Sequence, residues 1–218
     1  MIVAIDGPAA SGKSTTAKMV AKKLKMTYLD TGAMYRAVTL ALLRSNTDLD
    51  DYDSVCQVVD ELELDIYDQG SKTIVRLDGE DVSQAIRSMP VTKNVSAVSA
   101  VKYVREAMVE IQRNIGKKTN CVVEGRDIGT VVFPDAEFKI FMVADVKMRA
   151  ERRLKELHEM GENRSLQEVM TDLKRRDKKD STRSNSPLQK ADEAIEIDTS
   201  MLSIDQQVEK IINLVRKK

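Results

Sequence analysis

The sequence predicts an α/β fold in which a five-stranded parallel sheet carries helices on both faces. Short apolar runs alternate along the chain with stretches in which apolar residues recur every three or four positions. Strands that alternate with helices favour a parallel sheet joined by helical crossovers. The runs assigned to the sheet are residues 2–6, 27–30, 121–124, 138–143 and 194–198. An α/β insertion and a charged helical segment interrupt this core.

The first half of the chain supplies three helices and the insertion. Apolar residues at helical spacing predict the helices, over about residues 15–24, 33–44 and 54–62. Residues 64–67 and 73–77 are strand-like, and turn residues occupy 68–71 between them. Asp78-Gly79 makes a second turn. We therefore expect a small antiparallel insertion that extends to about Pro90.

Two helical patterns follow in the middle of the chain. The first runs from Val91 to Ile115, and Gly116 is placed to cap its C-terminus. The second covers about residues 146–160, with Asp145 as its N-cap and Gly161 beyond its end.

Capping boxes predict where the last two helices begin. Ser165 to Glu168 opens a helix in the charged region before the fifth strand, and Ser203 to Gln206 opens the final amphipathic helix. The side chain at the fourth position of each box can accept from the backbone N–H of the first.

Composition excludes several classes of protein. The 218 residues contain 35 basic and 35 acidic side chains, so the net charge gives no reason to expect nucleic acid or an anionic membrane as a partner. No stretch approaches the roughly 18–20 apolar residues of a membrane span, and the N-terminus lacks the pattern of a signal peptide. Cys56, Cys121 and the single His158 support neither a disulfide scaffold nor a zinc site. We expect a cytoplasmic protein.

A phosphate-binding motif lies directly after the first strand. The stretch GPAASGKS fits G-x-x-x-x-G-K-[ST], and it stands between an apolar run and a helical pattern. Backbone N–H groups and the helix dipole would converge there on the phosphates of a nucleotide. The residues expected to bind these phosphates, which the resemblance given below assigns to ATP, are Gly7, Pro8, Ala9, Ala10, Ser11, Gly12, Lys13, Ser14 and Thr15. Lys13 would reach the β- and γ-phosphates, and the Ser14 hydroxyl would ligate Mg²⁺.

The rest of the chain favours phosphoryl transfer over other uses of this loop. No strand end carries the Asn-Lys-x-Asp of a guanine-reading protein, and Cys121 to Glu124 is only a faint version of the acidic strand of a motor ATPase. Arginines crowd residues 149–183. Arginine suits the charge of a phosphoryl-transfer transition state because it binds phosphate oxygens bidentately. Arg152, Arg164 and Arg175 could equally lie on exposed helix faces and pair with acidic residues, without a role in phosphate binding.

Four motifs together resemble the bacterial cytidylate kinases, a family of small P-loop nucleoside-monophosphate kinases. They are IDGPAASGKS at 5–14, LDTGAMYR at 29–36, EGRDIGTVVFPDA at 124–136, and RDKKD at 176–180 with Arg183 and SPL at 186–188. The resemblance extends over about residues 2–215. Glu124 replaces an aspartate that is frequent in the family, and Thr31 replaces a serine of some members.

The resemblance implies an enzyme, a (d)CMP kinase that uses MgATP to phosphorylate CMP and dCMP. It implies a P-loop core of residues 1–34, 117–150 and 190–218. Residues 35–116 would form the monophosphate-binding insertion with its connecting helices, and residues 151–189 a short helical lid that contacts nucleotide. We expect Mg²⁺ as cofactor, ATP and CMP or dCMP as the only partners, and a monomer.

The resemblance also implies the role of each site residue. Cytosine would be read by Thr31, Arg105, Asp127 and Arg183. The ribose would be held by Ser96, Arg176 and Asp180, and the CMP phosphate by Arg36 and Arg126. The residues expected to act in the transfer step are Lys13, Arg126, Arg149 and Arg153. No general base is expected, because the attacking phosphate oxygen is already anionic.

Two other functions stay open at this point. A P-loop kinase for another small acceptor, such as a different monophosphate or shikimate, would carry the same phosphate loop. A nucleotide-binding regulatory protein without turnover would also carry it, but the arginines outside the loop would then be dispensable.

Overall fold

The computed structural model describes residues 1–69, 72–159 and 161–217. The chain divides into two compact units, residues 1–28 with 120–218 and residues 29–119. The turn expected at 68–71 falls partly, and the helix end expected at 160 wholly, outside the described residues. The three-part domain division drawn from the sequence stays a prediction.

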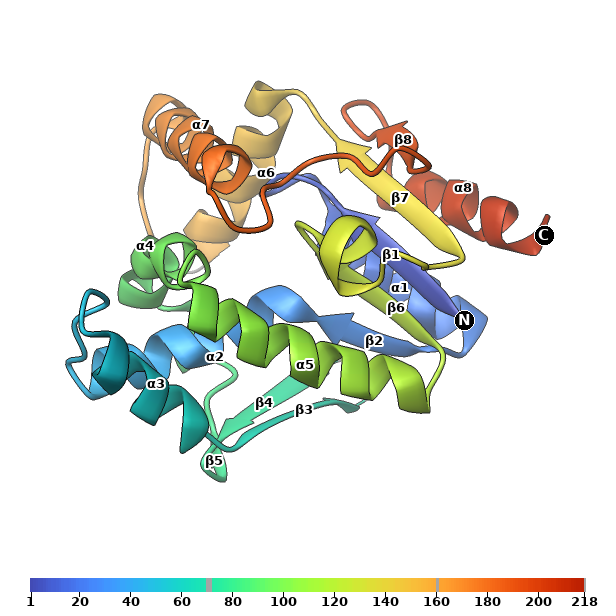
Figure 1. Ribbon diagram of the computed structural model, residues 1–218. Coiled ribbons are helices and arrows are strands. Elements are labelled where there is room, and N and C mark those ends of the chain that lie inside the picture. The colour runs from blue at the N-terminus through green and yellow to red at the C-terminus, as the bar shows by residue number, and fades with distance from the viewer. Residues whose placement is uncertain (70–71, 160, 218) are drawn as a thin grey trace. The chain divides into compact units, whose positions relative to one another are not determined.

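A five-stranded sheet confirms the predicted α/β class (Figure 1). Its strands are β1 (Ile2–Asp6), β2 (Thr27–Asp30), β6 (Cys121–Gly125), β7 (Phe138–Val143) and β8 (Ile195–Asp198). They lie in the order β2-β6-β1-β7-β8. β1 is parallel to both β6 and β7, and β7 is parallel to β8. The first strand of the chain is therefore central, and the loop that follows it leaves the middle of the sheet.

The helices of the first unit are α1 (Lys13–Leu24), α6 (Val146–Glu159), α7 (Leu166–Thr182) and α8 (Ile204–Arg216), with a helical turn at Ile128–Val132. Of these helices, α6, α7 and α8 begin where the sequence predicts caps, and α1 begins two residues before its expected start at residue 15. Asp145 accepts from the N–H of Lys147, at 2.8 Å. Both capping boxes, at Ser165 and at Ser203, are formed.

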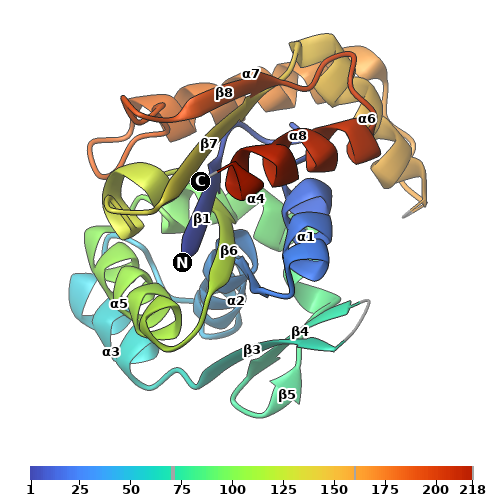
Figure 2. The same ribbon diagram turned by 90° about the vertical axis from the view of Figure 1, so that its right-hand side faces the viewer.

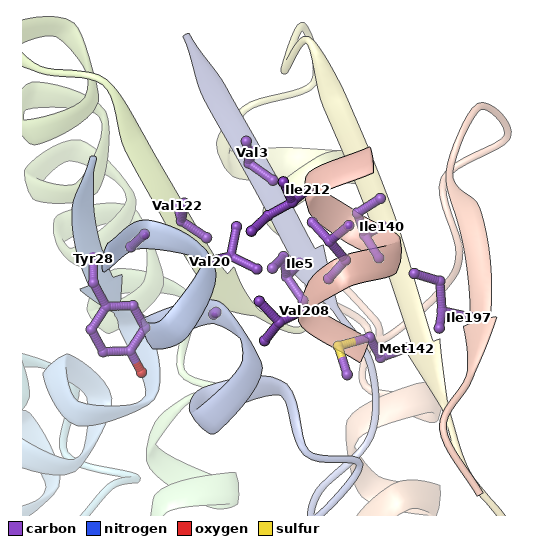
Figure 3. Close-up of a cluster of buried hydrophobic side chains, with 13 residues drawn as sticks. Val3, Ile5, Val20, Tyr28, Val122, Ile140, Met142, Ile197, Val208 and Ile212 are labelled. Atoms are coloured by element: carbon purple, nitrogen blue, oxygen red, sulfur yellow. The ribbon is translucent and has the colours of Figure 1, made fainter. Parts of the chain in front are cut away.

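The core of the first unit lies between the sheet and the helices α1 and α8 (Figures 2 and 3). Alternate residues of β1, Val3 and Ile5, point to this face because side chains alternate along a strand. They meet Val20 of α1 and Val208 of α8. Burying these branched side chains stabilises the unit by roughly 1.5–3 kcal/mol each. Asp6 follows Ile5 and is thereby directed to the opposite face.

The second unit is built from helices and a small antiparallel sheet. Its elements are α2 (Thr31–Arg44), α3 (Tyr52–Asp60), β3 (Leu64–Gln69), β4 (Lys72–Leu77), β5 (Glu80–Asp81), a short helix at Ala85–Arg87, α4 (Met89–Val98) and α5 (Lys102–Lys118). The strands pair antiparallel in the order β3-β4-β5, with Asp78 and Gly79 in the left-handed turn between the last two. The antiparallel insertion is confirmed, and the two-residue strand β5 is an addition to it.

The single helix expected from Val91 to Ile115 is wrong. The chain forms α4 and α5, and Ser99 to Val101 separates them. The Ser99 hydroxyl donates to the carbonyl of Ser96, and Arg105 donates to the carbonyl of Ser99 at 3.2 Å. Serine favours helix ends over interiors because its hydroxyl can bond to nearby backbone, and these bonds satisfy the carbonyls that the break releases. Gly116 lies inside α5 and does not cap it.

Gly7 has no room for a side chain. Its φ is +148°, and a Cβ there would lie 2.1 Å from the backbone oxygen of Met142. We predict that Gly7→Ala lowers the free energy of unfolding by about 3 kcal/mol or more, because backbone must move to relieve the overlap. Urea denaturation measures the change.

Gly161→Ala is the matched control, since its φ is +81° and a Cβ added there would meet no atom within 4 Å. It should cost only about 1 kcal/mol, from the left-handed backbone alone. Equal losses in the two variants would show that the contact with Met142 is unimportant.

Candidate active site

The loop after β1 has the conformation of an anion-binding loop. Gly12, the N-cap of α1, has φ +92° and has no side chain that could cap the helix, so the first N–H groups of α1 can donate to a ligand. Ala10 is also left-handed, at φ +58°. Successive backbone turns of this kind aim N–H groups at one point, where the helix dipole favours negative charge. The loop suits the phosphate role predicted for it.

Lys13 is buried and bound to the loop itself. Its Nζ donates to the Pro8 carbonyl at 2.8 Å. Burial, followed by the nearby Arg126 charge, lowers the pKa of Lys13 to about 7. An anion at the loop would favour the charged ammonium and so raise this pKa again.

A carboxylate stands beside the predicted magnesium ligand. Ser14 Oγ donates to Glu124 Oε2 at 2.9 Å, and the hydroxyl of the buried Tyr28 donates to the other oxygen of Glu124. Hydroxyl and carboxylate oxygens fit Mg²⁺, which keeps several waters and takes few protein ligands when phosphates are present. Within the described ranges no group of three or more His, Cys, Asp or Glu side chains is placed to hold a metal. The donors fit a phosphate-bound Mg²⁺ and not a metal cage built by the protein alone.

Asp6 connects this loop to the segment after β6. Its two carboxylate oxygens accept from the N–H groups of Ile128 and Gly129, at 2.9 and 2.8 Å. Burial raises the pKa of Asp6 to about 6, although these bonds and Lys13 lower it and Asp127 raises it further. The carboxylate thus fixes the turn that directly follows Arg126 and Asp127.

Asp180 pairs with two arginines, one expected to bind the CMP phosphate and the other the ribose. Arg126 Nε lies 2.9 Å from Asp180 Oδ2, and Arg176 Nε lies 4.0 Å from the same oxygen. Burial alone would raise the pKa of Asp180, but Arg126 and Arg176 lower it below its ordinary value. The structure therefore brings together three residues that the sequence assigned to one acceptor.

Asp127 and Arg183 lie side by side. Arg183 Nη2 is 3.7 Å from Asp127 Oδ1, and both side chains are buried. Arg183 Nε also donates to the Ser186 carbonyl at 2.7 Å, which fixes the plane of the guanidinium. A carboxylate acceptor next to a guanidinium donor can pair with a flat ligand edge that carries a donor next to an acceptor.

The two arginines of α6 that were expected to act in transfer have different surroundings. Arg149 is buried, donates to the Ala9 carbonyl at 3.1 Å and pairs with Asp177 at 2.7 Å. Arg153 pairs with Glu156 at 2.8 Å on a more exposed side of the helix. Arg149 therefore supports the phosphate loop from outside, a contact that the sequence did not predict.

Sequence reasoning missed other residues that hold the loop. Arg152 donates to backbone oxygens of Ser11 and Thr199, and Thr16 Oγ1 donates to the buried Gln207 at 2.7 Å. Arg152 lies three residues after Arg149 and therefore on the same face of α6, so the sequence spacing could have indicated a common role. Thr199 and Gln207 lie nearly 200 residues after the loop, and no local pattern marked them.

The remaining predicted site residues belong to the second unit. Arg36 donates to Thr92 Oγ1 at 3.0 Å and to the Ile86 carbonyl at 3.3 Å. Arg105 lies 5.3 Å from the ring centre of Tyr35. Thr31 is buried at the start of α2, and Ser96 is half-buried on α4.

The ionisation of Asp6 should appear in the stability of the protein. Because its folded pKa is raised from 3.8 to about 6, the folded state binds the proton more tightly than the unfolded state. The contribution of Asp6 to the free energy of unfolding is then largest below pH 4 and falls by about 3 kcal/mol in total as the pH rises through 6. Urea denaturation of wild type and Asp6→Asn between pH 4 and 7.5 gives this difference. A difference that does not change with pH would contradict the assignment.

Among the described residues, every helix is too short or too polar to span a membrane.

The family model for cytidylate kinase matches residues 3–217. The cytidylate kinase of Lactobacillus johnsonii is 47% identical over 100% of this chain and 95% of its own, and that of Clostridioides difficile is 46% identical over 99% and 98%. The fold is similar to that of shikimate kinase from Bacteroides thetaiotaomicron, with a TM-score of 0.50 and 11% identity over 99% of this chain and 98% of the other. The chain thus belongs to the cytidylate kinase family of phosphotransferases, as its motifs predicted.

Proposed function

We propose that this protein transfers the γ-phosphoryl group of MgATP to CMP and dCMP. The observation that carries the choice of acceptor is the pair of Asp127 and Arg183, 3.7 Å apart. Cytosine presents an amine donor beside a ring-nitrogen acceptor. A carboxylate beside a guanidinium matches that edge, whereas uracil presents a carbonyl oxygen where the carboxylate needs a donor.

The loop after β1 is the proposed donor site. The ATP phosphates would accept from its N–H groups, and Lys13 would leave the Pro8 carbonyl for them. Mg²⁺, when bound, neutralises charge on the β- and γ-phosphates. Ser14 would ligate it, and Glu124 would accept from its waters.

The transfer itself needs positioning and charge. An anionic oxygen of the CMP phosphate forms a bond to the γ-phosphorus while the bond from that phosphorus to the leaving β-phosphate oxygen breaks, giving CDP and ADP. Arg126, with its orientation set by Asp180, would hold the acceptor phosphate. Lys13, Arg149 and Arg153 are the further residues assigned to the transfer step. No side chain has to take a proton.

The other assignments rest on the resemblance to the family. They give Arg176 and Asp180 to the ribose, and in the second unit Thr31, Arg36, Ser96 and Arg105 to CMP. The lid over residues 151–189 would exclude water from the transfer. These assignments, the cytoplasmic location and the monomeric state stay predictions.

An acceptor panel tests the function. The purified protein is assayed with ATP and CMP, dCMP, UMP, AMP, GMP or shikimate, with Mg²⁺ and with excess EDTA. We expect turnover with CMP and dCMP at least about tenfold above the others, in line with the cost of one unpaired buried polar group. EDTA should abolish it. A preference for any other acceptor would exclude cytosine recognition, and binding of ATP without turnover of any acceptor would favour a regulatory protein.

Asp180 offers a second test with a matched control on the same helix. Asp180→Asn removes the charge that orients Arg126 and Arg176, and should lower kcat/KM for CMP by about ten- to a hundredfold while the Kd of ATP stays unchanged. Asp172→Asn is the control, because Asp172 also pairs with two arginines, Arg164 and Arg175, at the protein surface. The proposed acceptor site would be wrong if both variants kept the activity of the wild type.

A further inference from the structure

The carbonyl of Ser11, within the phosphate loop, accepts hydrogen bonds from two side chains. Thr199 Oγ1 lies 2.9 Å from this oxygen and Arg152 Nη1 lies 3.5 Å from it. The Val143 carbonyl, 3.0 Å from Thr199 Oγ1, is a second acceptor for the same hydroxyl. Thr199 is 0% exposed and directly follows β8. The phosphoryl transfer proposed above uses neither side chain.

Arg152 joins α6 to the turn after β8. Its Nη2 donates to the Thr199 carbonyl at 2.5 Å, and a second carbonyl, of Ser200, lies 3.5 Å away. Its Nη1 lies 3.3 Å from Thr199 Oγ1. The planar guanidinium thus spans three oxygens besides that of Ser11, which a lysine ammonium cannot do from one position.

These contacts set the direction of a backbone donor. In a trans peptide the carbonyl and the following N–H point in opposite directions, and the described chain contains no cis peptide. With the Ser11 carbonyl held by Arg152 and Thr199, the N–H of Gly12 must point away from both. A charged donor on the carbonyl also polarises the peptide and makes that N–H a stronger donor.

The loop needs such support because its backbone is strained. Ala10 has φ +58° and Gly12 has φ +92°. Glycine adopts this conformation freely, but a left-handed residue such as Ala10 persists only where surrounding contacts determine the conformation. Arg149 supplies one such contact at the Ala9 carbonyl, and Arg152 and Thr199 supply the next, two residues further along.

We propose that Arg152 and Thr199 are positioning residues for the triphosphate of ATP, acting through the Ser11–Gly12 peptide. This inference rests on the proposed donor site. Arg152 then stabilises the phosphate loop in addition to contacting the chain after β8. Thr199, the residue after the last strand of the sheet, then also determines nucleotide affinity.

Binding of two probes tests the proposal. ATP carries a base and inorganic triphosphate does not, so a loss shared by both identifies an effect on the phosphate loop. Thr199→Val keeps the shape of the side chain and removes the hydroxyl, whereas Arg152→Lys keeps the charge and removes the forked guanidinium. We expect each variant to raise the Kd of both probes about tenfold. Thr199→Ser keeps the hydroxyl and should return the Kd to within about threefold of wild type. KM for CMP should stay within about twofold.

Thr171→Val and Arg164→Lys are the controls. Among the described residues Thr171 Oγ1 donates to the Gln167 carbonyl of its own helix, and Arg164 pairs with Asp172. Weaker ATP binding with unchanged triphosphate binding would show that the residues contact the base, and would overturn the proposal. So would unchanged binding of both probes, or equal losses of ATP and CMP. If Thr199→Val does not fold, Arg152→Lys decides the question, and a wild type that binds neither probe would instead exclude the proposed donor site.

Discussion

Two hydrogen bonds, from the N–H groups of Ile128 and Gly129 to Asp6, fix the position of the phosphate loop relative to the segment after β6. Asp6 is the last residue of β1 and directly precedes the phosphate loop, while its two donors directly follow Arg126 and Asp127. A charged carboxylate buried in the core costs free energy, which is why the pKa of Asp6 is raised. The position keeps that charge because the two N–H donors satisfy it and fix the distance between the loop and the acceptor residues.

Charge in this unit serves two different purposes. Arg126 and Arg183 pair with the buried carboxylates Asp180 and Asp127, so they can exchange or share these partners with a nucleotide under the proposed function. Arg149 and Arg152 donate to backbone carbonyls of the loop. They stabilise the conformation that would receive phosphate. The arginine-rich segment therefore contains residues that stabilise the loop as well as residues proposed to bind the nucleotide.

Most of the fold was readable from the sequence because its signals are local. Strand runs, capping boxes at Ser165 and Ser203, and the glycine pattern of the loop act over a few residues, and all were confirmed. The break between α4 and α5 was not readable, since it depends on Arg105 reaching back to the Ser99 carbonyl. Apolar periodicity continues through residues 98–101 and predicts a helix there, although side-chain hydrogen bonds favour the break.

By itself the sequence determined the phosphate loop, the α/β class and the family, because fixed glycines, a lysine and a few motif residues carry that information without reference to the rest of the chain. Only the tertiary structure decided what supports the loop. For Arg152 the sequence left an exposed helix face and a functional role as equal alternatives, and Thr199 looked like an ordinary threonine after a strand. Their contact with Ser11 exists because β1 is central in the sheet and β8 lies on the far side of β7. Hydrogen bonds between segments nearly 200 residues apart depend on that strand order, which no local pattern specifies.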